Sequence, residues 1–159
     1  MNSLKEKKIM TVAIARVEDK LLLGRKKKKG FGYSKWNGLG GKVEEGENTD
    51  QAMKRECMEE GNIKVIDSIK RGVLTFHYTD DPEMEVHIYE IIKFKNKPED
   101  SDEMQCHWFD VDKLPFSKMW PDDSFWMPLF LNNKKFKGEF YFDENYAIVN
   151  HKLTKVNEL

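Results

Sequence analysis

The sequence is poor in cysteine, has no long hydrophobic run and carries almost no net charge. Only two cysteines occur, Cys57 and Cys106, and their spacing is not that of a metal-binding pair. A disulfide between them is possible, but the pattern favours a reduced intracellular protein. The sequence contains no run of about 18 apolar residues, the length that a membrane-spanning helix needs. Residues 1–10 also lack the apolar segment of a secretory signal. We therefore expect a cytoplasmic protein with no membrane partner. A nuclear or mitochondrial pool is compatible with the same features.

The balance of charges also excludes a broadly basic surface. The chain has 27 Lys plus Arg against 28 Asp plus Glu, a formal net charge of −1. Polymeric nucleic acid usually meets a basic face, so we expect a small-molecule ligand and no nucleic acid polymer. With 159 residues and 39% hydrophobic content, the chain fits one folded domain over residues 1–159. No apolar stripe is left unexplained, and we expect a monomer.

Apolar residues alternate along most of the chain, which predicts strands more often than helices. A helix is expected over residues 48–60, where Asn48, Thr49 and Asp50 are all suitable N-caps and Gly61-Asn62 is a suitable stop. A second, short helix is expected over residues 124–131, capped by Ser124. The predicted strands lie at residues 9–15, 21–23, 73–76, 85–89, 108–109, 139–142 and 146–149. One strong helix among many strands indicates an α+β sandwich.

The predicted first helix carries three carboxylates on one face. Glu56, Glu59 and Glu60 stand at i, i+3 and i+4, and like charges at that spacing repel one another. A hard divalent cation would relieve the repulsion, and oxygen-only ligands favour Mg²⁺, with Mn²⁺ as a substitute. The alternative is a solvated acidic stripe balanced by neighbours such as Lys42 and Arg55. Charge alone favours that alternative, whereas the ordered spacing favours the metal site.

The same stretch resembles the box of the Nudix hydrolases, G-x5-E-x7-R-E-U-x-E-E-x-G-U, where U is aliphatic. The residues that match in register are Gly41, Glu47, Arg55, Glu56, Cys57, Glu59, Glu60 and Ile63. One position departs from the pattern, because Asn62 stands where the box has its last glycine. Asn also adopts the left-handed conformation, so the helix is still expected to end there.

Outside the box, further segments resemble the oxidised purine nucleoside triphosphatases among the Nudix hydrolases. These segments are Gly30-Phe31-Gly32, Trp36-Asn37-Gly38, Ser101-Asp102-Glu103-Met104 and Met119-Trp120-Pro121-Asp122-Asp123-Ser124. The resemblance implies a Nudix α/β/α sandwich with a mixed central sheet and Mg²⁺ dependence. It also implies hydrolysis of substrates such as 8-oxo-dGTP and 2-hydroxy-dATP to the monophosphate and pyrophosphate. Two loops differ in length: residues 26–29 are one residue longer than in the family, and the turn at Pro82 is one shorter.

The resemblance assigns residues to the metal and the phosphates. The implied metal shell is the Gly40 carbonyl with Glu56, Glu59, Glu60 and Glu103. For the proton acceptor from water, Glu60 and Glu103 remain alternatives, with Glu56 beside them as a third catalytic carboxylate. The implied phosphate-side contacts are Leu39, Gly40, Gly41, Lys42 and Lys26, the last at either the phosphate or the base.

The base is expected to lie against Thr11, Asn37, Phe76, Met84, Trp120, Pro121, Asp122 and Asp123. Trp120 offers a flat apolar face for stacking, and Asn37 offers both a donor and an acceptor. If Asp122 and Asp123 share one desolvated pocket, at least one pKa is raised. The neutral carboxyl can then donate to a purine carbonyl while its partner accepts, and exchanging the proton would admit both oxidised bases. The alternative is that this acidic pair only caps a helix.

Two other functions remain open from the sequence. One is a Nudix hydrolase for a dinucleotide polyphosphate, a nucleotide sugar or an RNA cap. The other is a non-catalytic Nudix-fold module that binds nucleotides or protein partners. The complete set of Glu56, Glu59 and Glu60 argues against the second.

Overall fold

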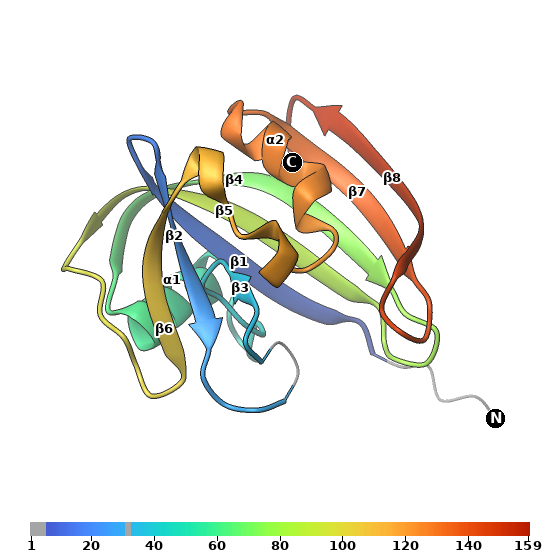
Figure 1. Cartoon of the computed structure of the whole chain (residues 1–159), viewed down its shortest axis with the longest axis horizontal. Helices are drawn as coiled ribbons and strands as arrows, with labels where there is room; N and C mark the ends of the chain where they lie inside the picture. The colour runs from blue at the N-terminus through green and yellow to red at the C-terminus, as the bar shows by residue number, and fades with distance from the viewer. Residues whose placement is uncertain (1–5, 31–32) are drawn as a thin grey trace.

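The computed structural model describes residues 6–30 and 33–159, which form a mixed sheet between two α-helices (Figure 1). Residues 1–5 and 31–32 lie outside this description, and with them the motif residue Phe31. The strands are β1 Lys8–Val17, β2 Lys20–Lys26, β3 Trp36–Asn37, β4 Lys64–His77, β5 Met84–Lys95, β6 Met104–Asp110, β7 Lys135–Phe142 and β8 Ile148–Val156. The helices are α1 Thr49–Gly61 and α2 Asp123–Leu131, with short 3-10 turns at Val111–Lys113 and Phe116–Lys118.

The sheet runs in the order β3-β2-β1-β5-β4-β7-β8, and β6 pairs with β2. β1 lies parallel to β5, and β4 lies parallel to β7, whereas the other pairs are antiparallel. The predicted mixed sheet is therefore confirmed. Because β1, β5 and β4 are neighbours at its centre, residues far apart in the chain, such as Thr11 and Phe76, share one region of the sheet.

Helix α1 has the ends that its local sequence predicts. The Asn48 side chain accepts from the Gln51 backbone N–H at 2.8 Å, and the Gln51 side chain accepts from the Asn48 N–H at 2.9 Å. This reciprocal capping box satisfies two amide donors that an uncapped helix leaves free. At the other end Asn62 has φ 60°, the left-handed conformation expected of the box glycine.

Two buried clusters hold the three layers together. On one face of the sheet, Met53 and Cys57 of α1 pack with residues such as Tyr89. On the other face, Trp126 and Phe130 of α2 pack against the strands. Figure 1 shows α2 in orange beside β4 and β7, with α1 on the far side of the sheet. The predicted α/β/α sandwich is confirmed.

The second helix and the strands differ from the prediction in detail. Helix α2 begins at Asp123, so Ser124 lies inside the helix, and the prediction that it caps the helix was wrong. Strands β4 and β5 extend over 14 and 12 residues, far beyond the predicted 73–76 and 85–89, because pairing with neighbours continues where the apolar alternation stops.

Neither cysteine forms a disulfide in the structure. Cys57 and Cys106 are free thiols, and burial raises the pKa of Cys57, so it packs as a small apolar side chain. Within residues 6–30 and 33–159, no helix has both the length and the apolar character needed to span a membrane.

Candidate active site

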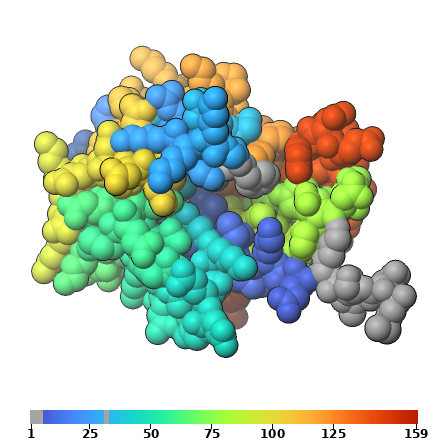
Figure 2. All heavy atoms as spheres, turned by 90° about the horizontal axis from the view of Figure 1, so that it is seen from below, coloured from blue at the N-terminus to red at the C-terminus, as the bar shows by residue number. Residues whose placement is uncertain are grey.

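Two cavities adjoin beside the central strands. The first is lined mainly by β1, β4, β5 and the start of α2, and we call it the base cavity. The second is open to solvent and is lined by carboxylates of α1 and by basic residues at the end of β2 and in the segment after it, and we call it the phosphate cavity. The two cavities share Met10, Asn37, Gly38, Gly40, Gly41 and Trp120. Figure 2 shows the face where the blue-to-cyan segment after β2 and the β4–β5 and β7–β8 turns come together.

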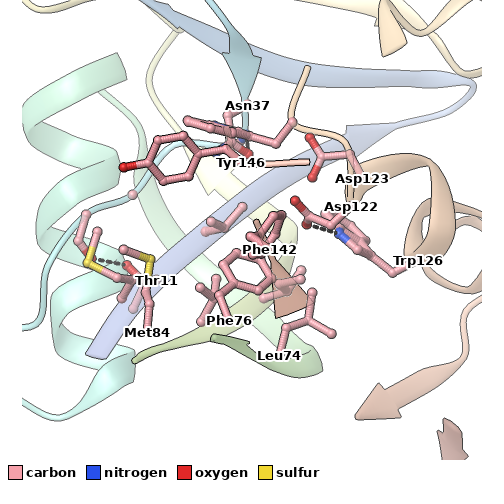
Figure 3. A pocket seen from close by; sticks show the side chains of 18 of the residues that line it. Thr11, Asn37, Leu74, Phe76, Met84, Asp122, Asp123, Trp126, Phe142 and Tyr146 are labelled. Atoms are coloured by element: carbon pink, nitrogen blue, oxygen red, sulfur yellow. Dashed lines mark hydrogen bonds between the residues drawn. The ribbon is translucent and has the colours of Figure 1, made fainter. Parts of the chain in front are cut away.

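The base cavity contains seven of the eight residues predicted to meet the base. These are Thr11, Asn37, Phe76, Met84, Trp120, Asp122 and Asp123. Alternating residues of β4 and β5 point inward, which brings Phe76 and Met84 to the cavity, and Thr11 of β1 lies beside Met84 (Figure 3). Pro121 is the exception, because its side chain is exposed and does not line the cavity.

Asp122 and Asp123 are both 3% exposed and lie side by side at one wall of the cavity (Figure 3). Asp122 accepts a hydrogen bond from Trp126 Nε1 at 2.9 Å. The Oδ2 atom of Asp123 is buried and has no hydrogen-bond partner among the described residues. A buried polar atom without a partner costs free energy unless a ligand satisfies it. The pair therefore presents an unsatisfied oxygen to any molecule in the base cavity.

Burial raises the pKa of both aspartates. The pKa of Asp123 lies well above its usual range, because the neighbouring Asp122 adds like charge, and the nearby Lys35 only partly opposes this. One proton held between the two carboxyl groups relieves the repulsion. The alternative of a simple helix cap is not supported, since Asp122 occupies the N-cap position but makes no side-chain cap hydrogen bond.

Trp120 forms part of the wall common to both cavities. The Lys35 Nζ atom lies 5.2 Å from the centre of its ring, close enough for a cation–π interaction. Across the same boundary, Asn37 Oδ1 accepts from the Gly38 N–H at 2.8 Å, which leaves the amide nitrogen of Asn37 available as a donor. These two side chains can thus offer a stacking surface and a hydrogen bond to one base.

Arg55 organises the acidic face of α1. Its guanidinium bonds to both oxygens of Glu47, at 2.7 and 3.0 Å, and to Glu56 at 2.9 Å and Glu59 at 3.2 Å. The bidentate contact with Glu47 fixes the segment before the helix against the helix itself. Arg55 and Glu47, which were predicted as matches to the Nudix box, therefore position the carboxylates.

Glu60 is buried at the wall of the phosphate cavity. It accepts from the Gly40 N–H at 2.8 Å, yet burial raises its pKa to about 8, and the charges of Glu56 and Glu103 add to the shift. Burial also raises the pKa of Glu56, although Arg55 opposes this. Carboxylates that raise one another's pKa lie close together and gain most from a cation.

Gly40 and Gly41 have no side chain, which lets the chain pass close to β1 and to the Glu56 carboxylate. A Cβ on Gly40 would lie 1.9 Å from the Thr11 carbonyl oxygen, and a Cβ on Gly41 would lie 2.7 Å from Glu56 Oε1. The carbonyls of Leu39 and Gly41 bond to β1, whereas the Gly40 carbonyl between them accepts no hydrogen bond from the described residues. An open carbonyl beside Glu56 and Glu60 is an oxygen donor set that fits a hard divalent cation.

The metal shell is nevertheless not assembled in the structure. Within the part of the chain described, no three Asp, Glu, His or Cys side chains converge as ready ligands. Arg55 holds Glu56 and Glu59, and the Glu59 side chain is 59% exposed. Glu103 lines the phosphate cavity from the loop before β6. The assignment of Gly40, Glu56, Glu59, Glu60 and Glu103 as metal ligands therefore stays a prediction.

Three other residues predicted at the phosphates have different placements. Lys26 lines the phosphate cavity, as expected of a phosphate-side residue. Lys42 is exposed, lines neither cavity, and its carbonyl accepts from Arg55. Leu39 is buried in the core beneath α1, and both its N–H and its carbonyl bond to Ala13. Leu39 thus supports the glycines and has no group to offer a substrate.

Sequence reasoning missed residues that complete the base cavity. They are Met10, Val12, Leu74, Tyr78, Val86, Ile88, Trp126, Phe142 and Tyr146. Met10 and Val12 are each one residue away from Thr11, so the strand period places their side chains on the opposite face of β1 from that of Thr11, and only the tertiary structure shows that all three line the cavity. Tyr146 lies in a turn and has no local signal.

A mixed sheet between two helices, with an Arg-held glutamate helix beside two adjoining cavities, is the arrangement of the Nudix-fold hydrolases. The profile of the NUDIX domain matches residues 7–130. The chain belongs to the Nudix hydrolase family. Enzymes of this family generally need a divalent metal ion.

Two relatives resemble the chain along nearly its whole length. It is 44% identical to the oxidized purine nucleoside triphosphate hydrolase of Danio rerio, over 96% of this chain and 97% of that protein. It is 40% identical to the protein of the same name from Mus musculus, over 94% and 96%. Among solved structures, a MutT protein from Bacillus halodurans has a TM-score of 0.80 at 22% identity, covering 92% of this chain and 97% of its own, which supports the fold alone.

Proposed function

We propose that this enzyme hydrolyses oxidised purine nucleoside triphosphates, such as 8-oxo-dGTP and 2-hydroxy-dATP, to the monophosphate and pyrophosphate, and so clears the nucleotide pool of damaged precursors. The observation that carries the proposal is the buried Asp122–Asp123 pair, with its unpartnered oxygen, in a cavity that adjoins the glutamates of α1. The names of the two relatives support the same substrate class.

The aspartate pair suits an oxidised purine because it can donate and accept together. With one shared proton, the neutral carboxyl donates to a purine carbonyl and the ionised one accepts from a ring N–H. Moving the proton reverses the two roles, so the same pair can bind oxidised guanine and oxidised adenine. Asn37 and Trp120 supply a further hydrogen bond and a stacking surface.

We propose Mg²⁺ as the metal, with Mn²⁺ able to replace it, held by the Gly40 carbonyl, Glu56, Glu59, Glu60 and Glu103. When bound, the cation supplies charge neutralisation of the triphosphate oxygens and a lower pKa for the attacking water. Arg55 keeps Glu56 and Glu59 in place for it. Glu60 and Glu103 are the two candidates that take the proton from water. Lys26, the last residue of β2, lines the phosphate cavity and is the proposed basic contact to the substrate.

We further propose that the protein acts as a monomer on free nucleotides in the cytoplasm, with a nuclear or mitochondrial pool as an additional place of action. The narrow base cavity suits a single base, and nucleic acid polymer is not expected as a substrate. Size-exclusion chromatography with light scattering measures the mass, which should be close to 18.8 kDa. A mass near twice that value would reject the monomer.

The test of the function is pyrophosphate release from a panel of triphosphates with and without Mg²⁺. The panel contains 8-oxo-dGTP, 2-hydroxy-dATP, dGTP, dATP and dCTP, together with a dinucleotide polyphosphate and a nucleotide sugar. We expect metal-dependent release mainly from the two oxidised purines. Equal rates across the panel, or a preference for the dinucleotide or the sugar, would reject the proposed specificity. No release from any compound would indicate a binding module.

A further inference from the structure

Tyr146 stands at the base cavity in an unusual backbone conformation. It lies in the turn between β7 and β8 with φ 62°, in the left-handed region that an aromatic residue rarely adopts. The turn is held by Asp143, whose Oδ1 atom accepts from the N–H groups of Asn145 and Ala147 at 2.8 and 3.0 Å. A conformation of this kind costs free energy and persists where the surroundings impose it, often at a functional site.

The Tyr146 side chain joins two turns that are distant in the sequence. Its hydroxyl donates to Asp81 Oδ2 at 3.1 Å, across from the β4–β5 turn. Its ring meets Tyr78 edge-on with the centres 5.7 Å apart, and Tyr78 in turn stacks on Phe142 at 5.2 Å. Figure 2 shows the two turns side by side, yellow-green beside orange-red. Two chain segments are thus held together by one side chain.

The same ring lines the base cavity. Figure 3 draws Tyr146 with Asn37 along one side of the cavity, and Leu74 and Phe76 along the other. The side chain is 40% exposed, so it forms part of the rim and not of the closed core. In the proposed function, Asp122 and Asp123 bind the polar edge of the base at another wall. Tyr146 would then contact the part of the nucleotide that lies away from the aspartates.

We propose that Tyr146 is a specificity-determining residue, whose ring packs against the bound purine nucleotide and is kept at the rim by its hydrogen bond to Asp81. This inference rests on the proposed function. A bicyclic purine anchored at the aspartates spans more of the cavity than a pyrimidine does, so the ring favours purines. The contact forms on binding and does not involve the reacting phosphates, so it acts on KM and leaves kcat nearly unchanged.

Four variants test the proposal through kcat, KM and the melting temperature. Tyr146→Gly removes the ring and its bond to Asp81, which destabilises the fold, but it also relieves the left-handed backbone, so the two effects oppose each other and the melting temperature should change little. The KM for 8-oxo-dGTP should rise about three- to tenfold, the effect of losing one aromatic contact, with kcat within about twofold. The preference for 8-oxo-dGTP over dCTP should narrow by a similar factor.

Tyr146→Phe and Asp81→Asn, which change only the hydrogen bond, should show smaller shifts in KM. Asp80→Asn is the matched control, because Asp80 bonds to Thr79 and not to Tyr146.

An unchanged KM and an unchanged selectivity in Tyr146→Gly would overturn the proposal. A lower melting temperature with unchanged selectivity would assign Tyr146 a purely structural role and overturn it as well. The dissociation constant of 8-oxo-dGMP, measured by calorimetry, separates this failure from that of the proposed function. If the wild type binds this product without hydrolysing the triphosphate, the hydrolase activity is rejected and Tyr146 is still tested by binding. If the wild type neither binds nor hydrolyses oxidised purines, both proposals fall.

Discussion

Glu60 and Asp123 are both buried carboxyl groups, but their surroundings differ. Glu60 accepts a hydrogen bond from Gly40 and lies near other glutamates, whereas Asp123 has an oxygen with no partner among the described residues. The first environment suits a proton acceptor close to a cation, and the second suits a group that awaits a ligand. Each can be tested by replacing the carboxyl with an amide of nearly the same shape.

Glu60→Gln should lower kcat by about a hundredfold or more, the usual range for a lost general base or metal ligand. The fold should survive, because the amide oxygen of Gln can still accept from the Gly40 N–H. Steady-state kinetics with 8-oxo-dGTP and a thermal melt check both expectations. Near-normal turnover with a normal melt would remove Glu60 from the catalytic group and leave Glu103 as the proton acceptor.

Asp123→Asn should change how stability depends on pH. Burial raises the pKa of Asp123 well above 3.8 in the folded protein, so the carboxyl stabilises the fold most below that value and loses its contribution as pH rises through the folded pKa. The free energy of unfolding should therefore fall less steeply above about pH 4 in the variant than in the wild type. Urea unfolding at several pH values measures this dependence. If the free energy of unfolding changes with pH equally in the variant and the wild type, folding does not raise the pKa of Asp123.

The same substitution should also alter base selection. Asp122→Asn and Asp123→Asn should change the ratio of kcat/KM between 8-oxo-dGTP and 2-hydroxy-dATP, because an amide cannot exchange the proton. The exposed Asp112→Asn serves as the surface control. If this ratio changes no more in the two aspartate variants than in the control, the hypothesis of a shared proton at this site is contradicted.

At the scale of elements, α1 and α2 show what local sequence can predict. The bounds of α1 agree with prediction within one residue, because its capping box and its left-handed stop are both local. The start of α2 was missed, because the Asp122 side chain bonds to Trp126 and does not cap the helix. The Asp122 side chain bonds to Trp126 because both are buried, and this burial arises only when α2 packs on the sheet.

Asn62 tests the end of α1 directly. Asn62→Gly should leave the free energy of unfolding within about 0.5 kcal/mol or raise it, since glycine adopts φ 60° without strain. Asn62→Val should lower it by about 1–2 kcal/mol, because a β-branched residue is disfavoured in the left-handed region. Urea unfolding of the three proteins checks the order. An equal stability of the Gly and Val variants would mean that the backbone at this residue does not matter.

At the scale of the whole molecule, one buried ion pair ties α2 to the sheet. Arg71 bonds to Glu90 at 2.9 Å, their side chains are 9% and 7% exposed, and Arg71 also donates to the Asn133 carbonyl after α2 at 3.1 Å. Arg71 and Glu90 lie on the adjacent strands β4 and β5. The pair thus joins the centre of the sheet to the end of the helix that begins at Asp122 and Asp123.

Glu90→Gln should lower the free energy of unfolding by about 3–5 kcal/mol, because it leaves the Arg71 charge buried without its counter-ion. Below the melting transition, kcat/KM should stay near normal, since neither residue lines a cavity. Asp50→Asn, which breaks the exposed pair with Lys54, is the control and should change stability little. Equal losses of stability in the two variants would show that the buried pair stabilises the fold no more than the exposed pair does.

The Nudix box, the helix that carries it and the family could be read from residues 41–63 alone, because ligand type, capping and helical period are all local properties of consecutive residues. The α+β class follows from the pattern of one strong helix among many strands, whereas the three layers were implied by the family resemblance. The base cavity could not be derived in the same way, since it combines β1, β4, β5, α2 and a distant turn. The inward position of Leu39, the partnerless oxygen of Asp123 and the placement of Tyr146 against Asp81 depend on strand order and packing. Only the tertiary structure brings such residues together, because contacts between distant segments leave no periodic signal in the chain.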